Sequence, residues 1–346
     1  MAALQAPWPA AVAVSGGGDS LALMLLLAEW AREAGKARPV VLTVDHGLRP
    51  SSKKDAERVR KVAGEQGLEA HMLAWKGPKP VSDVEAESRT ARYSLMGGWC
   101  ADHGVKALYA GHTLDDQAET FLLRLARGSG LDGLAAMRPE SAIPIADFRH
   151  IALVRPMLEF ARRELRDFLE AQGIPWSEDP MNADLQFSRA RVRAAWPQLT
   201  ELGLTPERLA DAAQHLGRVR MALDALTHDF LNRAARFSDH SVALDPVRLK
   251  TIPREIGLRA LAKLLCLVSG EDYRPRFDSL ERLFDAILGY ALGGGMTLHG
   301  CIVAPAPAES QVFGSATVKI SKEAGRRPKE PATGPERTKA NIGRDN

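Results

Sequence analysis

Cysteine is scarce in this chain, and its three copies, Cys100, Cys266 and Cys301, have no CxxC spacing. This argues against a disulfide scaffold or a structural zinc site and fits a reducing compartment. Long apolar runs are also missing, because the longest, residues 21–28, is too short to cross a bilayer. The N-terminus lacks the cationic and long apolar segments of a secretory signal. We therefore expect a cytoplasmic protein, and exclude membrane, disulfide-rich secreted and fibrous classes.

An excess of either charge is likewise absent, with 46 Lys and Arg against 43 Asp and Glu, a formal net charge of +3. The stretch 321–346 has seven cations and four anions, so it carries the whole excess. The rest of the chain is close to neutral, and a nucleic-acid site there must be a local basic patch. The same stretch is rich in Pro, Gly and charged residues, which predicts a disordered basic tail.

The 346 residues, of which 45% are hydrophobic, are enough for two or three domains. In the first part, β-branched runs alternate with helical patterns. The predicted strands are 11–14, 40–44 and 107–110, and the predicted helices are 21–33, 53–66 and 85–103. This alternation predicts an α/β domain with a parallel sheet over residues 1–200.

The remainder of the chain predicts a different organisation. Residues 197–204 suggest a linker, and apolar residues at helical spacing predict a long helix from 206 to 236. We assign 201–239 to a helical linker region and 240–320 to a small α+β domain.

A glycine-rich loop joins the first predicted strand to the first predicted helix. It consists of Ser15, Gly16, Gly17, Gly18, Asp19 and Ser20. Glycines let backbone N–H groups turn toward an anion, and the helix N-terminus adds the positive end of its dipole. No lysine follows at the spacing of GxxxxGKS/T, and Leu21 occupies the place of the third glycine of GxGxxG. We predict a phosphate-binding loop of another type; a helix entry capped by Ser and Asp is the alternative.

Two further polar clusters follow the other predicted strands. Asp45 and His46 end the second strand, where an acid can reach a ribose hydroxyl or a metal, or simply form a turn. Residues 112–120 follow the third strand and contain His112, Asp115, Asp116 and Glu119. Their carboxylates suit Mg²⁺ better than zinc, although acids in a first helical turn are also ordinary dipole partners. All three clusters should meet at the carboxyl edge of a parallel sheet.

Two groups of arginines are candidates for phosphate or RNA contacts. Arg89 and Arg92 share a helical stripe with Glu85, so salt bridges to Glu85 are the simpler explanation. Arg189, Arg191 and Arg193 alternate in a stretch that also contains aromatic residues, a composition that suits RNA but is weak evidence alone.

Taken together, these segments resemble the tRNA(Ile)-lysidine synthetases, a family of the PP-loop ATP pyrophosphatase superfamily. The resemblance covers about residues 10–200. It rests on the loop 15–20, on the segment 44–49 followed by Ser52, on the block 110–131, and on the segments 155–158, 176–182 and 188–193. The chain departs from the family pattern at Gly111, where Ala is frequent, and at Met157 and Met181.

The resemblance implies a PP-loop (adenine nucleotide alpha hydrolase-like) fold and a ligase that attaches L-lysine to the wobble cytidine of the isoleucine tRNA with a CAU anticodon, using ATP. It implies that residues 15–20 bind the ATP phosphates and that Asp45 and Asp116 contact lysine or a metal. Asp19 and Asp116 are the candidate Mg²⁺ ligands. His112 would stabilise the transferring phosphate, with Arg189 or Arg193 near the adenylate or the tRNA.

Two alternatives remain open from the residues. A PP-loop tRNA thiolase would activate the same kind of carbonyl but deliver sulfur, for which a CxxC pair or a reactive cysteine near the loops is expected. A non-catalytic tRNA-binding protein would have lost the chemistry of its loop, which the intact motifs argue against.

Overall fold

The computed structural model describes residues 7–48, 52–77, 79–80, 83–178, 184–239, 241–271, 273–307, 312–314 and 316–323. The chain divides into two compact units, Met1–Arg220 and Met221–Asn346. The division falls inside helix α8 (Pro206–Ala234), within the stretch predicted as a linker region.

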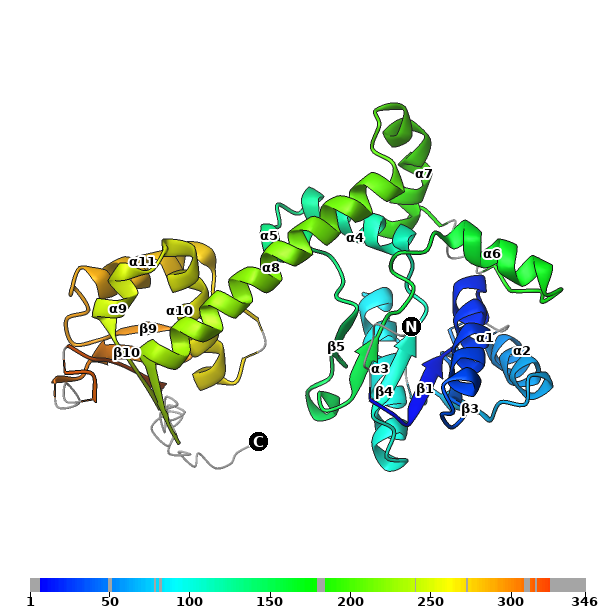
Figure 1. Ribbon diagram of the computed structural model, residues 1–346, viewed down its shortest axis with the longest axis horizontal. Coiled ribbons are helices and arrows are strands. Elements are labelled where there is room, and N and C mark those ends of the chain that lie inside the picture. Colours follow the sequence, from blue (N-terminus) through cyan, green and yellow to red (C-terminus); the bar gives the residue numbers. More distant parts are fainter. Residues whose placement is uncertain are drawn as a thin grey trace, which may run out of the picture. The chain divides into compact units, whose positions relative to one another are not determined.

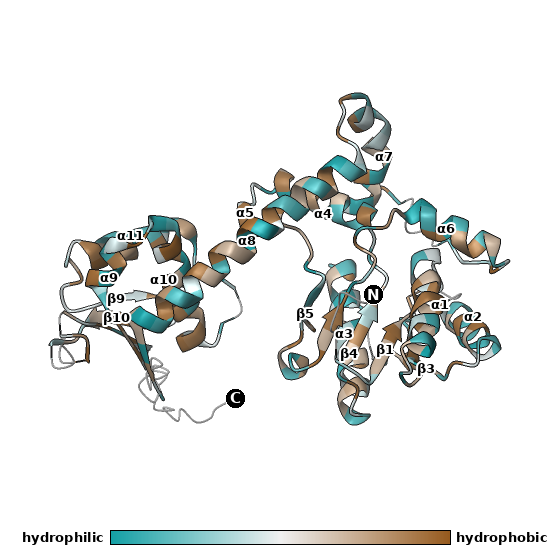
Figure 2. Ribbon diagram, viewed as in Figure 1, coloured by the Kyte–Doolittle hydropathy of each residue, from teal (hydrophilic) through white to brown (hydrophobic). Residues whose placement is uncertain are grey.

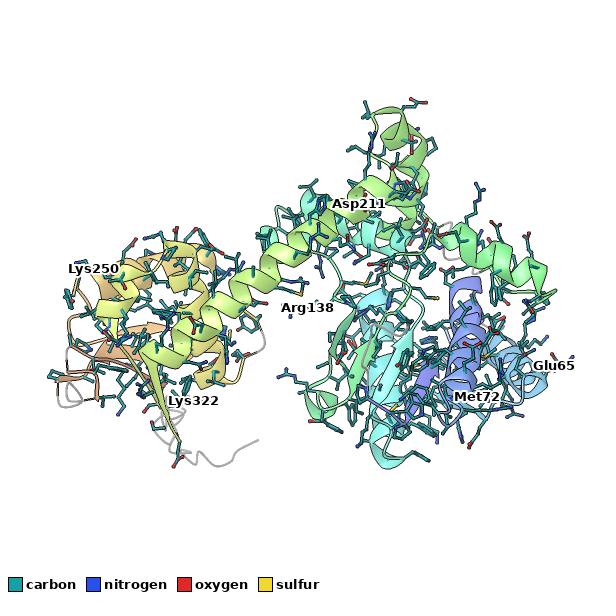
Figure 3. All side chains as sticks on the ribbon, in the orientation of Figure 1. Glu65, Met72, Arg138, Asp211, Lys250 and Lys322 are labelled. Carbon is teal, nitrogen blue, oxygen red and sulfur yellow. The ribbon has the colours of Figure 1, made fainter. Side chains whose placement is uncertain are left out.

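The first unit is built on a six-stranded sheet with the order β3-β2-β1-β4-β6-β5. Its strands are β1 (Ala10–Ala13), β2 (Val40–Asp45), β3 (Ala70–Ala74), β4 (Ala107–Ala110), β5 (Glu140–Ala142) and β6 (Ala152–Val154). All neighbouring pairs are parallel except β5 and β6, which are antiparallel. The parallel α/β sheet predicted from the sequence is therefore confirmed. Met72, labelled in Figure 3, marks the edge strand β3.

Helices cover both faces of this sheet. Those that pack on the strands are α1 (Gly18–Glu33), α2 (Ser52–Glu65), α6 (Arg162–Ala171) and α3 (Val84–Asp102). The unit also contains α4 (Leu114–Ala126), α5 (Leu131–Leu134), α7 (Ser188–Glu201) and a 3-10 turn, η1 (Ala146–Phe148). Figure 1 shows α1 and α2 on one side of β1 and α3 on the other.

Alternating strand residues explain this layering. Val12, Val41 and Tyr109 pack in one core cluster with α1, α2 and α6. Their neighbours Leu42 and Leu108 point the other way and pack with α3. Because successive strand side chains alternate between faces, apolar residues at every position give a sheet that is buried on both sides. Figure 2 shows β1 and β4 largely in brown, as this predicts.

The second unit is an antiparallel sheet packed against helices. Its strands are β7 (Ala235–Ser238), β8 (Ser241–Leu244), β9 (Met296–Leu298), β10 (Cys301–Pro305) and β11 (Val318–Lys322), in the order β7-β8-β11-β10-β9. Its helices, besides the end of α8, are α9 (Pro246–Thr251), α10 (Arg254–Ser269) and α11 (Phe277–Leu288). The core lies between α10, α11 and the strands and includes Leu261, Phe284 and Ile320. The α+β character predicted for this region is confirmed.

Three details of the sequence prediction are wrong. Pro197 lies inside α7 rather than in a linker. An interior proline costs about 3 kcal/mol of helix stability; packing of the neighbouring Trp196 against the cluster formed by α4 and α8 contributes in the opposite direction.

The other two errors concern strand ends. Ala235 and Arg236 pair with β8 instead of extending the long helix. Ser321 and Lys322 pair with β10, so the tail does not begin at 321; Lys322 is labelled in Figure 3. The predicted disorder of residues 324–346 lies outside the described residues. None of the described helices is both long and apolar enough to span a bilayer.

Candidate active site

The loop after β1 has the backbone geometry of an anion cradle. Gly16 has a φ of +90°, a conformation that L side chains rarely adopt, and its carbonyl accepts a 3.0 Å hydrogen bond from Ser177 N. Gly17, in an extended conformation, is the N-cap of α1, and no side chain caps the helix there. The first N–H groups of a helix lack intrahelical partners. These donors and the helix dipole therefore favour an anion at the mouth of the loop.

The two serines of the loop form hydrogen bonds within the loop itself. Ser20 Oγ donates to Gly17 O at 2.9 Å and accepts a 3.2 Å hydrogen bond from Ser15 N. The Ser15 and Ser20 hydroxyl oxygens lie 3.3 Å apart. Ser15 is exposed and Ser20 is buried, so Ser15 is the hydroxyl that faces solvent.

Gly111 brings the end of β4 against this loop. A Cβ built on Gly111 would lie 3.0 Å from both Asp19 O and Ser20 Cα. Those atoms belong to backbone, which cannot give way as a flexible side chain can. The close approach explains the glycine at the position where the family pattern frequently has Ala, and it places the following residue, His112, beside the loop.

Asp116 has two functions at the start of α4. Its Oδ2 accepts hydrogen bonds from Thr113 N at 2.9 Å and from Thr113 Oγ1 at 3.0 Å, completing a capping box. Its Oδ1 lies 3.1 Å from an Arg189 guanidinium nitrogen and 3.4 Å from an Arg162 nitrogen. One oxygen of Asp116 therefore stabilises the start of the helix, as an acid in a first helical turn commonly does, while the other oxygen belongs to an ion-pair network.

Arg162, the first residue of α6, joins the three acids of that network. Its Nε donates a 3.1 Å hydrogen bond to Asp19 Oδ2, and its other nitrogens approach Asp116 and Glu119 at 3.4 and 3.6 Å. The backbone N of Arg162 also donates to Asp115 Oδ2 at 2.7 Å. One guanidinium thus links the phosphate loop, α4 and α6.

Glu119 lies at the centre of a second set of contacts. The side chain is fully buried, and Arg193 forms a bidentate interaction with it. Arg193 Nε lies 2.6 Å from Glu119 Oε1, and a terminal nitrogen lies 3.2 Å from Oε2. Arg189 also approaches Glu119 at 3.6 Å. A buried carboxylate needs such partners, because an unpaired charge in the interior costs several kcal/mol. These contacts hold α7 against α4.

Burial and neighbouring charges compete in setting the pKa values of the network. Burial raises the pKa of Asp19 above its usual range, although Arg162 opposes the shift. For Asp116, burial also favours the protonated form, but the guanidinium charges of Arg162 and Arg189 outweigh it and the pKa is lowered. The acids Asp116, Asp19 and Glu119 raise the pKa of Arg162 despite its burial. Asp116 and Arg162 are therefore both charged at neutral pH.

His112 is neutral in this environment. Burial lowers its pKa to about 3, against an opposing effect of Asp116. Its Nδ1 is buried and makes no hydrogen bond with the described part of the protein. A neutral imidazole with an unused nitrogen can donate a hydrogen bond to, or accept one from, a group that enters the site.

Asp45 is engaged in the loop after β2. It accepts a 2.5 Å hydrogen bond from Ser52 Oγ and a 3.0 Å bond from Gly47 N. The hydrogen bond from Ser52 lowers the pKa of Asp45; burial opposes this shift, and the hydrogen bond from Gly47 adds to it. The turn interpretation of Asp45 is thus realised in the structure, and its contact with lysine or a metal stays a prediction.

A cavity of about 250 Å³ opens beside the network. His46, Arg92, Phe187, Arg189 and Arg193 are among its lining residues. The loop after β2, helix α3 and helix α7 therefore converge, as expected for the carboxyl edge of a parallel sheet.

The structure brings together most of the residues chosen from the sequence. The loop 15–20, Asp116, Arg189 and Arg193 belong to one connected network with Arg162 and Glu119. Arg162 was not predicted, because nothing in the local sequence signals a contact with residues far away along the chain. Glu119 was predicted only as one of the carboxylates that follow the third strand, and its four-residue spacing from Asp115 on one helix face was the available signal.

Comparison with known proteins identifies the family. The PP-loop domain model matches residues 6–199. A tRNA(Ile)-lysidine synthase of Ruegeria pomeroyi is 41% identical over 283 residues, covering 82% of this chain and 66% of that protein. One of Methylobacterium nodulans is 41% identical over 307 residues, covering 84% and 86%. The chain belongs to the tRNA(Ile)-lysidine synthase family. It spans about two thirds of the length of the Ruegeria synthase.

A solved structure supports the fold independently. The U34-tRNA thiolase NcsA of Methanococcus maripaludis superposes with a TM-score of 0.51 at 18% identity, covering 63% of this chain and 74% of the thiolase. At that identity the likeness concerns the fold alone. This chain and the thiolase therefore share an α/β scaffold.

Proposed function

We propose that this protein ligates L-lysine to C2 of the wobble cytidine of the CAU-anticodon isoleucine tRNA. In the first step the cytosine O2 attacks the α-phosphorus of ATP, and pyrophosphate leaves. In the second step the lysine ε-amine attacks C2, the C2–O2 bond breaks, and AMP leaves with that oxygen. The product is lysidine. Membership of the tRNA(Ile)-lysidine synthase family, together with the intact loop at residues 15–20, carries this proposal.

The geometry of the loop supports phosphate binding. The turn at Gly16, the uncapped start of α1 and the exposed Ser15 hydroxyl provide donors and positive potential for a nucleotide. Both nucleophiles, the cytosine oxygen and the lysine amine, come from substrates, so the protein needs no covalent nucleophile of its own. Its contribution is to position the substrates and to stabilise charge in the transition state.

The ion-pair network provides charged groups beside the loop. Arg162 and Arg189 can approach the developing negative charge, while the carboxylates of Asp116 and Glu119 hold both guanidinium groups in place. His112 offers a neutral hydrogen-bonding group next to the loop. An enzyme in which acids orient arginines before the substrates arrive avoids reorganisation during the reaction.

Magnesium fits this site as a companion of ATP. No group of three or more His, Cys, Asp or Glu side chains within the described residues is arranged to hold a metal. Mg²⁺ is commonly held through one or two carboxylates together with substrate phosphates. Asp19 would be the protein ligand, because both Asp116 oxygens already have partners. The ion would supply neutralisation of phosphate charge.

The structure disfavours the thiolase alternative. Cys100 is fully buried in α3, and burial raises its pKa to about 12. The other two cysteines belong to the second unit, and burial raises the pKa of each thiol. A thiol of raised pKa in an apolar setting is a poor nucleophile.

Incubation with a CAU-anticodon tRNA transcript, lysine and ATP tests the proposal. Nuclease digestion followed by mass analysis should find lysidine at the wobble position, with AMP and pyrophosphate released in equal amounts. A transcript whose wobble base is uridine should give neither product. Release of ADP, or modification that depends on a sulfur donor rather than on lysine, would overturn it.

A further inference from the structure

One wall of the cavity beside the network has polar groups that the protein itself leaves unused. Ser88 and Arg92 lie four residues apart on α3, so their side chains share one face of the helix. Ser88 Oγ and Arg92 Nε are both buried from solvent, and neither has a hydrogen-bond partner among the described residues. Both residues line the cavity of about 250 Å³.

Buried donors without a hydrogen-bond partner lower the stability of the folded protein, so their presence in this wall of the cavity points to a ligand. A buried donor left without a partner costs about 1–3 kcal/mol, and more when the group is charged. The salt bridge to Glu85 that the sequence suggested for the stripe does not form between described residues; Arg89 instead lies over the Tyr93 ring at 5.0 Å. Burial lowers the pKa of the Arg92 guanidinium; Tyr93 opposes this shift, and the charges of Arg89 and Arg189 add to it.

An anion in the cavity would relieve both deficits. The guanidinium of Arg92 has donors only, and the hydroxyl of Ser88 can also donate, so together they demand an acceptor. The cationic Arg189 and Arg193 line the same cavity from α7, and their own carboxylate partners belong to α4. A planar guanidinium with a hydroxyl beside it matches the oxygens of a phosphate or a carboxylate.

We propose that Ser88 and Arg92 form an oxyanion-binding site that orients one substrate of the ligation. The inference rests on the proposed function, since that function supplies the two candidate oxyanions: the α-carboxylate of lysine and a backbone phosphate of the tRNA. Both have the same chemistry at the oxygen atoms, and the cavity volume accommodates either group. Arg92 and Ser88 bind this group and do not touch the bond that is made or broken.

Binding measurements on the full chain separate the two sources without requiring turnover. The variants are Ser88→Ala, Arg92→Lys and Arg92→Gln. Calorimetry gives the affinity for lysine and for cadaverine, which lacks the carboxylate, and filter binding gives the affinity for the tRNA transcript at two salt concentrations. Ser94→Ala, half-buried on the same helix, is the matched control for Ser88→Ala. Arg89→Gln, exposed and outside the cavity lining, is the matched control for the charge change.

The site predicts loss of affinity for one substrate only. Ser88→Ala should weaken binding about threefold to tenfold and Arg92→Gln about tenfold to hundredfold, with Arg92→Lys in between. If the oxyanion is the carboxylate, lysine affinity falls, cadaverine affinity does not, and tRNA binding is unchanged. If it is an RNA phosphate, tRNA affinity and its salt dependence fall while lysine binding is unchanged.

Two results would overturn the site. In one, Ser88→Ala and both Arg92 variants bind lysine and tRNA as tightly as the parent protein. In the other, the controls lose as much affinity as the cavity variants. These affinities are measured independently of the lysidine assay. If the parent protein makes no lysidine but the Ser88 and Arg92 variants still lose affinity for one substrate, the proposed function is refuted and the site is not.

Discussion

Arg162 Nε lies 3.1 Å from Asp19 Oδ2, although the two residues are 143 positions apart in the sequence. This hydrogen bond ties the first turn of α6 to the phosphate loop, and the same guanidinium reaches two acids of α4. The loop is thus held both by the ion pair between Arg162 and Asp19 and by the hydrogen bonds that Ser15 and Ser20 make within the loop. The position of the loop therefore depends on residues of α4 and α6, outside the loop itself.

Arg162→Ala should destabilise the first unit by about 3 kcal/mol, because it leaves buried carboxylates without their shared cation. Urea unfolding followed by circular dichroism measures the effect. Arg163→Ala is the matched control: that side chain is 90% exposed, against 18% for Arg162, and its pairing with Asp167 is at the surface. The control should change stability by less than about 1 kcal/mol. Equal losses in the two variants would contradict a structural role for the network.

Gly16→Ala should weaken ATP binding and destabilise the fold by about 1–2 kcal/mol, because an L residue at a φ of +90° is strained. The new methyl group would also lie 3.3 Å from Val59 Cγ2. Gly64→Ala in α2 meets nothing within 4 Å and should stabilise the protein by up to about 1 kcal/mol. Nucleotide titration and thermal unfolding measure both variants. An ATP affinity that survives in Gly16→Ala would show that the turn is not needed for phosphate binding.

Asp116→Asn should reduce tRNA-dependent pyrophosphate release by at least about a hundredfold, because Arg162 and Arg189 lose the charge that orients them. Asparagine is chosen since its amide oxygen can still cap α4, whereas alanine would remove the cap as well. Asp211→Asn, at an exposed α8 position labelled in Figure 3, is the control. Full activity of Asp116→Asn would show that this carboxylate is not needed for the reaction.

His112 should make the protein less stable in mild acid. Burial lowers its pKa to about 3 in the folded state, against about 6.5 in an unfolded chain. As the pH falls from 6.5 toward 3, the unfolded state takes up a proton that the folded state does not, so stability is lost over that range. At pH 5 the loss should be about 2 kcal/mol relative to neutral pH.

Urea unfolding of His112→Asn at pH 7 and pH 5 checks this expectation. The variant should lose about 2 kcal/mol less than the parent between the two pH values. His150→Asn, at an exposed position in the same unit, should behave as the parent does. Identical pH dependence of the parent and His112→Asn would mean that the imidazole is not held neutral.

Much of the fold could be read from local patterns. Consecutive apolar residues at 11–14, 40–44 and 107–110 predicted buried strands, and these correspond to β1, β2 and β4 to within one residue. The strand at 70–74 was not recognised, because its half-buried position at the edge of the sheet allows a mixed sequence with a histidine. The segment 235–236 was predicted as helix, and only its pairing with β8 makes it a strand.

The sequence by itself determined the phosphate loop, the polar clusters at the strand ends and the family, since these depend on residue types at spacings of a few positions. Only the tertiary structure decided which charges meet, as Arg162 does with Asp19 and Arg193 with Glu119. It also decided that Arg92 Nε is buried without a hydrogen-bond partner among the described residues. The physical reason is range. Backbone conformation follows from near neighbours, whereas a buried charge is stabilised by groups within a few ångströms in space, wherever in the chain they originate.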